Sequence, residues 1–124
     1  MRQVVYHFVK AQIADKSRKG CTMKILSINS SPRTGDQSKT EMMLNHLVEG
    51  MQKAGAEVEI VNLREKKIKY CIGCFTCWTK TPGKCIHKDD MTKELFSKWL
   101  NSDLAVYATP LYHYTVNAEM KAFI

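Results

Sequence analysis

Four of the five cysteines in this 124-residue chain lie close together in the sequence. Their spacing, Cys71-x₂-Cys74-x₂-Cys77-x₇-Cys85, lets one loop curl so that several sulfur atoms face a common centre. Four thiolates suit a [4Fe–4S] cluster or a tetrahedral zinc ion. A reducing compartment would keep these thiols from pairing as disulfides, so the pattern predicts metal or redox chemistry. The spacing leaves three alternatives open: an iron–sulfur cluster, structural zinc, or thiols without a ligand.

A second group of chemically useful side chains occupies residues 29–40, which read NSSPRTGDQSKT. The backbone N–H groups at the start of a helix form an anion site, to which Ser31, Ser38 and Thr40 would add hydroxyls and Arg33 a positive charge. The loop contains neither GxGxxG nor GxxxxGK[ST], which argues against a dinucleotide or Walker-type site. We therefore expect the loop to hold a monophosphate. The alternative is that Ser38 only caps the helix that follows.

The hydrophobic pattern predicts the elements that position these groups. Strands are expected at residues 24–29, 56–63 and 103–110, a helix between the first two and ending at Gly55, and a second helix over 91–102 with Met91, Leu95, Trp99 and Leu100 inward. Residues 64–90 lack periodicity, and a further loop and helix follow Pro110. This βαβαβα order predicts a doubly wound parallel sheet with helices on both faces. The loops after strands one and three should then share one edge of the sheet.

The charge distribution and the apolar segments argue against nucleic-acid-binding and membrane proteins. The formal net charge is +7, but residues 1–24 hold six basic groups against one acidic, and the remaining charge is expected to be dispersed. We therefore expect no nucleic-acid partner. No segment has the roughly 20 apolar residues of a membrane span, and no secretory signal is recognisable, so a cytoplasmic protein without a membrane partner is expected. Residues 1–22 are interpreted as a basic extension outside the core, and residues 23–124 as one domain.

Several motifs together resemble those of a known family. These are KILSINSSPR at 24–33, QSKT at 37–40, CIGCFTCW at 71–78, KCIHKDDM at 84–91 and ATPLYHYTVNAEMKAFI at 108–124. They are similar to the flavodoxin-fold NAD(P)H-dependent FMN reductases, and within these to the iron–sulfur flavoprotein branch. The resemblance implies a flavodoxin-like α/β sheet of five strands, of which about the first three β-α units would be present. Residues 23–124 would then be an FMN-binding domain that is incomplete at its C-terminus.

The same resemblance assigns residues to the cofactors. The FMN phosphate would lie on Ser31, Arg33, Gln37, Ser38 and Thr40, and the isoalloxazine ring on Pro110, Leu111 and Tyr112. It favours a [4Fe–4S] cluster as the ligand of Cys71, Cys74, Cys77 and Cys85.

The resemblance also implies an activity. The expected protein is an FMN-dependent oxidoreductase that takes electrons from NAD(P)H or an electron-carrier protein, passes them to an acceptor, and forms a homodimer or larger assembly. No residue is expected to act as an essential acid or base, because the flavin performs the chemistry. The alternatives are a non-catalytic flavodoxin-like electron carrier and a zinc-stabilised interaction module.

Overall fold

The computed structural model describes residue 20 and residues 22–124. The N-terminal extension proposed for residues 1–22 therefore lies almost wholly outside the described residues. Among the helices that are described, none has the length and apolar character needed to cross a bilayer.

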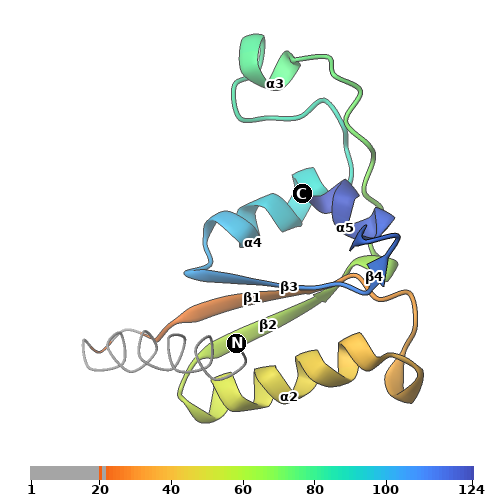
Figure 1. Cartoon of the computed structure of the whole chain (residues 1–124). Helices are drawn as coiled ribbons and strands as arrows, with labels where there is room; N and C mark the ends of the chain where they lie inside the picture. Colours follow the sequence, from red (N-terminus) through yellow and green to blue (C-terminus); the bar gives the residue numbers. More distant parts are fainter. Residues whose placement is uncertain (1–19, 21) are drawn as a thin grey trace.

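A parallel three-stranded sheet forms the centre of the described chain (Figure 1). Strand β1 (Lys24–Asn29) lies between β2 (Glu57–Asn62) and β3 (Leu104–Ala108). The register pairs Ile25 with Leu104 and Ile28 with Val61. The parallel sheet confirms the predicted α/β, flavodoxin-like class and all three predicted strands.

Helices cover both faces of this sheet, as the alternation of strands and helices predicts. Helix α2 (Lys39–Lys53) lies on one face, and α4 (Phe96–Leu100) and α5 (Ala118–Phe123) lie on the other (Figure 1). Shorter elements are the 3₁₀ turns η1 (Gly35–Gln37) and η2 (Leu63–Glu65), helix α3 (Thr76–Thr79) and the π-helical turn η3 (Met91–Leu95). Strands β4 (Leu111–Tyr112) and β5 (Thr115–Val116) form a small antiparallel hairpin.

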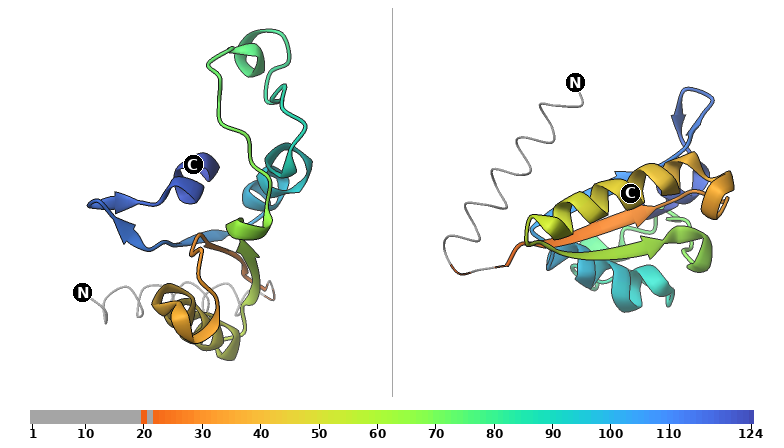
Figure 2. Two further views of the ribbon diagram at one scale, coloured as in Figure 1. Left: turned by 90° about the vertical axis from the view of Figure 1, so that its right-hand side faces the viewer. Right: turned by 90° about the horizontal axis from the view of Figure 1, so that it is seen from below.

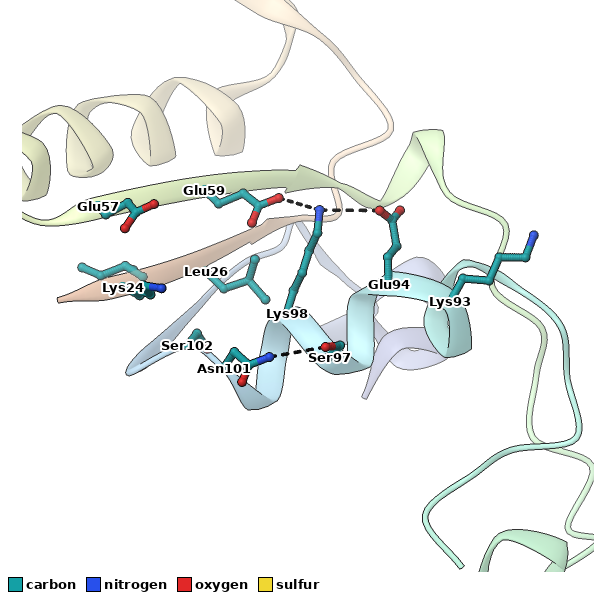
Figure 3. A pocket seen from close by; sticks show the side chains of 11 residues that line it. Lys24, Leu26, Glu57, Glu59, Lys93, Glu94, Ser97, Lys98, Asn101 and Ser102 are labelled. Carbon is teal, nitrogen blue, oxygen red and sulfur yellow. Dashed lines mark hydrogen bonds and ion pairs between the residues drawn. The ribbon is translucent and has the colours of Figure 1, made fainter. Parts of the chain in front are cut away.

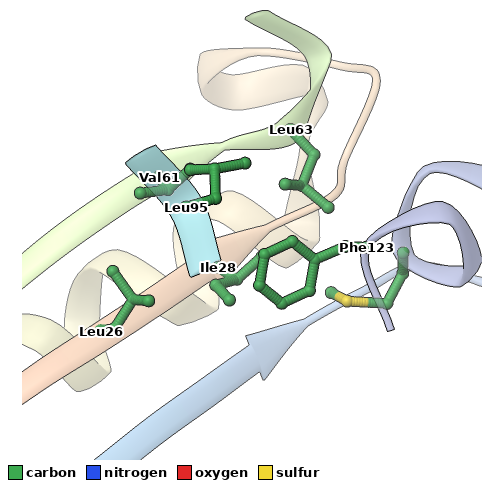
Figure 4. Packing of buried hydrophobic residues seen from close by; sticks show 7 residues of the cluster. Leu26, Ile28, Val61, Leu63, Leu95 and Phe123 are labelled. Atoms are coloured by element: carbon green, nitrogen blue, oxygen red, sulfur yellow. The ribbon is translucent and has the colours of Figure 1, made fainter. Parts of the chain in front are cut away.

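Alternate residues of β1 build two separate cores. Ile25 packs toward α2 with Leu44, Val48 and Met51. Leu26 and Ile28 face the opposite side, where they join a cluster completed by Val61, Leu63, Leu95, Met120 and Phe123 (Figure 4). Burial on both faces is why the central strand reads as a nearly continuous apolar run.

The predicted orientation of the second long helix is only partly correct. Leu95 is fully buried, but Trp99 is 40% and Leu100 is 61% exposed, so the prediction that these two point inward is wrong. The π-helical turn over Met91–Leu95 adds a residue to one helical turn. Trp99 and Leu100 lie after this turn, and Leu100, five positions beyond the buried Leu95, falls on another side of the α-helix. Trp99 instead stacks on Phe96 and donates a hydrogen bond to the Tyr107 hydroxyl at 2.8 Å.

Candidate functional site

The hydroxyl-rich loop begins where β1 ends, directly beside the end of β3. The Ser30 N–H donates to the Ala108 carbonyl at 2.9 Å, and the Ser30 hydroxyl lies 3.3 Å from the same oxygen. The segments after β1 and β3 therefore share the carboxyl edge of the sheet, as predicted (Figure 1). This edge is where open α/β sheets bind their ligands.

Ser31 and Ser38, seven residues apart, come together in this loop. Their hydroxyl oxygens are 2.7 Å apart, and both residues are almost fully buried. Ser38 also accepts a hydrogen bond from the Glu41 N–H at 3.1 Å, which makes it the N-cap of α2. The capping role considered from the sequence is therefore real, but it does not account for the buried contact with Ser31.

The other predicted phosphate ligands lie in the same loop or in the first turn of α2. Arg33 and Gln37 are exposed, whereas Thr40 is half-buried at the start of α2. In the described part of the chain, the N–H groups of Lys39 and Thr40 have no acceptor within hydrogen-bond distance. Because the first N–H groups of a helix carry partial positive charge, α2 points a cationic end toward this loop. The arrangement suits a small anion.

Arg64 contacts the start of the loop and is absent from the predicted set of site residues. This residue belongs to η2, directly after β2. Its guanidinium lies 3.3 Å from a carboxylate oxygen of Glu41 and 3.5 Å from the Ser31 carbonyl. Its side chain is only 19% exposed. An arginine just after a strand carries no sequence pattern of its own, so only the tertiary structure reveals this contact.

Asn117 is a second residue of the site that is absent from the predicted set. It is buried at the start of α5, where its Oδ1 caps the helix by accepting from the Met120 N–H at 3.2 Å. Its Nδ2 donates to the Ser30 carbonyl at 2.6 Å, and Thr109 Oγ1 lies 3.2 Å from Oδ1. Asparagine before an apolar helical run is a recognisable capping signal, although the contact with Ser30 spans 87 residues.

The segment predicted to hold the flavin ring forms the β4–β5 hairpin. Pro110 is half-buried, whereas Leu111 is 72% and Tyr112 is 44% exposed. The hairpin stands out from the carboxyl edge of the sheet (Figure 2). It therefore presents exposed apolar side chains at the same edge of the sheet as the hydroxyl-rich loop.

The two residues at the tip of the hairpin have an unusual backbone. His113 and Tyr114 have φ angles of 47° and 61°, and Tyr114 is 99% exposed. Two-residue hairpin turns of this kind normally contain Asn and Gly, because other side chains are strained at positive φ. The sequence His-Tyr carries no such signal, and we expected only a loop here.

The four clustered cysteines lie on an arm that extends away from the sheet (Figures 1 and 2). We define the cysteine arm as residues 66–88, which contain the short helix α3. Cys71, Cys74 and Cys85 are exposed, and Cys77 is half-buried. No three His, Cys, Asp or Glu side chains of the described residues are gathered closely enough to hold a metal ion. The donor set therefore has the right chemistry for a cluster or zinc, but its atoms are not arranged as a ligand shell.

Asp89 and Asp90 fasten the base of the cysteine arm. The carboxylate of Asp89 accepts from the Lys69 N–H at 2.9 Å and from the Thr92 N–H at 3.0 Å. Asp90 accepts from the Lys67 N–H at 2.7 Å. Burial of Asp89 opposes ionisation, but the hydrogen bonds from Lys69 and Thr92 outweigh it and lower the pKa of Asp89. The two legs of the arm are therefore joined where they leave the body.

Two further features distinguish the arm. Hydrogen bonds from the Thr76 hydroxyl and N–H lower the pKa of the Cys74 thiol. The arm also carries six lysines and no acidic residue, whereas residues 25–65 and 89–124 together carry seven basic and eleven acidic groups. This clustering differs from the dispersed charge expected beyond residue 24. The fold instead gathers the positive charge on the projecting arm.

A separate groove of about 400 Å³ lies between α4 and the strands β1 and β2 (Figure 3). Its wall includes Lys24 and Glu57, which lie at the amino ends of their strands and therefore far from the hydroxyl-rich loop. Within it, the Lys98 ammonium lies 2.6 Å from Glu59 and 3.5 Å from Glu94. The hydrogen bond to Glu59 is the main reason that the pKa of Lys98 is raised. These charges compensate one another, so the groove offers no excess charge to a ligand.

Comparisons of the sequence with a family model and with individual proteins agree on one family. The model of the NADPH-dependent FMN reductases matches residues 23–124. An iron–sulfur flavoprotein of Archaeoglobus fulgidus is 43% identical over 103 residues, which cover 82% of this chain and 44% of the relative. One from Methanocaldococcus jannaschii is 33% identical over 102 residues, with 82% and 49% covered. An FMN-dependent NADH:quinone oxidoreductase of Bordetella parapertussis is 28% identical over 113 residues, with 82% and 52% covered.

The chain thus spans about half the length of the curated relatives that it matches. No solved structure matches it.

Proposed function

The chain belongs to the NADPH-dependent FMN reductase family, with iron–sulfur flavoproteins among its relatives, and we propose that it binds FMN and takes part in electron transfer as an oxidoreductase. The buried hydroxyl pair of Ser31 and Ser38 at the N-terminus of α2 is the observation that carries this proposal. Two hydroxyls gathered beside helix N–H groups fit one phosphoryl group. FMN, when bound, would supply the hydride and electron chemistry.

The protein's own residues would bind and orient this cofactor. Ser31, Ser38 and Thr40 would donate hydrogen bonds to phosphate oxygens, and Arg33 and Gln37 would close over them from the exposed side. Ser31 and Ser38 would exchange part of their mutual hydrogen bonding for the phosphate, while the Glu41 N–H stays capped by Ser38. Pro110, Leu111 and Tyr112 would support the ring and exclude water from one of its faces.

Electron exchange with a reduced nicotinamide or a carrier protein is part of the same proposal, as is a homodimer or larger assembly. The activity of an FMN-dependent NADH:quinone oxidoreductase among the relatives supports a nicotinamide donor. The name of the more similar relatives supports a [4Fe–4S] cluster on Cys71, Cys74, Cys77 and Cys85. Because these thiols are spread over the arm, binding a cluster requires the arm to close around it.

The first test is a titration of the purified full-length protein with FMN, followed by flavin fluorescence. We expect tight binding by the wild type. The double change Ser31→Ala/Ser38→Ala should weaken it by one to two powers of ten, at about 1.4 kcal/mol per tenfold. The pair Ser97→Ala/Ser102→Ala, in which Ser97 is exposed and Ser102 half-buried, lies on the opposite face and serves as the control. Equal affinity of both double variants for FMN would place the phosphate elsewhere.

Loss of the helix cap must be separated from loss of the phosphate ligand in this test. Replacing Ser38 alone should also lower the free energy of unfolding by about 1 kcal/mol, since it caps α2. Ser31→Ala removes a hydroxyl that caps no helix, so its effect on FMN affinity is the cleaner measure. The absorbance spectrum and the iron, sulfide and zinc contents of anaerobically purified protein distinguish a flavoprotein with a cluster from one without. A colourless zinc protein that ignores FMN would contradict the proposal.

A further inference from the structure

Ser30 and Asn117 form a buried junction between the phosphate loop and the ring-binding hairpin. Ser30 is fully buried and Asn117 is 3% exposed. Ser30 is the first residue after β1, and Asn117 is the first residue after β5. A side chain at this point can set how far apart the two halves of the cofactor site lie.

Asn117 uses every polar atom of its amide in this junction. Its Nδ2 donates to the Ser30 carbonyl at 2.6 Å, and its Oδ1 accepts from the Met120 N–H and from Thr109 Oγ1, each at 3.2 Å. Its backbone N–H lies 3.4 Å from Thr109 Oγ1, so Thr109 and Asn117 also close the base of the hairpin. One side chain thus contacts the phosphate loop, the hairpin base and the first turn of α5.

In this junction the phosphate loop is held independently of Asn117, whereas the hairpin depends on it. Ser30 is already held to the end of β3 through the Ala108 carbonyl, and Ser31, the next residue, belongs to the hydroxyl pair. The hairpin has only two residue pairs, and a two-stranded ribbon of this size is not stable by itself. Its position therefore depends on what holds its base, and the buried amide of Asn117 is the hydrogen-bonded connection to the phosphate loop.

We propose that Asn117 is a positioning residue that fixes the hairpin carrying Pro110, Leu111 and Tyr112 at the distance from Ser31 and Ser38 that one FMN molecule spans. This inference rests on the proposed function. Its consequence is specific. A ligand that contacts both the phosphate loop and the hairpin binds more tightly when their separation is fixed, because its second contact then forms at a high effective concentration. The affinity for a ligand that contacts only the loop or only the hairpin does not depend on Asn117.

The variant Asn117→Ser tests this inference. Serine still caps α5, so the helix is retained, but its hydroxyl is too short to reach the Ser30 carbonyl. Thr109→Val is the second variant, since it removes the other contact of the junction without adding a charge. Asn45→Ser, on the exposed side of α2, is the matched control. Dissociation constants are measured for FMN, for riboflavin, which lacks the phosphate, and for inorganic phosphate.

We expect Asn117→Ser to weaken FMN binding about tenfold and to change the constants for riboflavin and phosphate by no more than about twofold. Thr109→Val should act in the same direction with a smaller effect, and Asn45→Ser should change none of them. An unchanged FMN affinity would overturn the inference. A parallel loss for all three ligands would do so as well, because it would indicate general destabilisation.

An amide NMR spectrum of the FMN-free protein separates this inference from the proposed function. If the wild type binds no FMN, the proposed function fails, but the junction itself can still be judged. Asn117→Ser should then shift amide resonances in both residues 31–37 and residues 111–115, and Asn45→Ser should shift neither group. Shifts confined to α5 would show that Asn117 is only a helix cap.

Discussion

Asp89 shows how one buried carboxylate organises the base of the cysteine arm. It receives hydrogen bonds from the N–H groups of Lys69 and Thr92 and from the Thr92 hydroxyl. The contact with Lys69 joins the first leg of the arm to the residue that directly follows the second leg, 20 positions away. These hydrogen bonds favour the charged form, so the pKa of Asp89 is lower in the folded than in the unfolded protein.

This lowered pKa gives the first prediction, on the pH dependence of stability. A carboxylate with a depressed folded-state pKa stabilises the fold above its unfolded pKa, about 3.9 for aspartate, and loses that contribution as the pH falls through the folded-state value. Asp89→Asn should therefore lower the free energy of unfolding by about 1–2 kcal/mol near neutral pH. The difference from wild type should shrink below about pH 4.

Urea denaturation at several pH values measures this difference. The exposed change Asp36→Asn serves as the control and should have little effect. A gap between wild type and Asp89→Asn that stays constant down to about pH 3 would contradict the assigned role of the charge.

The β4–β5 hairpin is the element in which local sequence and observed conformation disagree most. His113 and Tyr114 both adopt the left-handed backbone conformation, which costs a non-glycine residue roughly 1–2 kcal/mol. The hairpin persists because both of its ends are fixed. Val116 packs against the core beneath α5, and Asn117 and Thr109 close its base.

Relief of this strain is the prediction at the level of the element. The double change His113→Asn/Tyr114→Gly replaces the tip with the sequence that such turns favour, and the Tyr114 side chain is almost fully exposed. We expect the free energy of unfolding to rise by about 1 kcal/mol, which a denaturant midpoint would detect. Tyr70→Gly, at an exposed tyrosine with negative φ, should not stabilise the protein. If both changes lower the midpoint equally, the turn is not strained.

At the level of the whole molecule, the described chain divides into a packed sheet with its helices and a projecting arm. The arm displays large apolar side chains as well as its thiols, including Trp78 at 76% exposure, which packs edge-on against Phe75 with 5.5 Å between ring centroids. Its contacts with the body are concentrated at the base, around Asp89 and Asp90. Segments with few buried contacts open more readily than a packed core.

Limited proteolysis should report this division. We predict that trypsin cleaves the metal-free protein after Lys80 or Lys84 before it cleaves within β1, α2 or β3, because exposed loops are the preferred sites of nicking. Loading the thiols with zinc under reducing conditions should slow this cleavage several-fold, since ligation would close the arm. The fragments are identified by mass spectrometry.

A variant lacking two thiols, Cys74→Ser/Cys85→Ser, provides the control for this experiment. It should be cleaved at the same rate with and without zinc. Equal rates for wild type in both conditions would argue against a metal site on the arm.

The amino-acid sequence by itself determined the elements and the places where chemistry is concentrated. Strands β1, β2 and β3 and helix α2 follow from apolar residues at strand and helix spacing, a local signal that the core then reinforces. The hydroxyl-rich loop and the cysteine arm were visible as clusters of residue types. The parallel order further implied that the segments after β1 and β3 meet at one edge, as the contact between Ser30 and Ala108 confirms.

Only the tertiary structure decided which side chains meet within that frame. The contacts of Arg64 with Ser31 and of Asn117 with Ser30 join residues 33 and 87 positions apart, and no local preference encodes them. The π-helical turn over Met91–Leu95 has no signal in the apolar spacing, and contacts at the base of the hairpin hold the His113–Tyr114 turn in a backbone conformation that these residues disfavour. Spacing along a chain reports local periodicity, whereas these features arise from contacts formed when distant segments pack together.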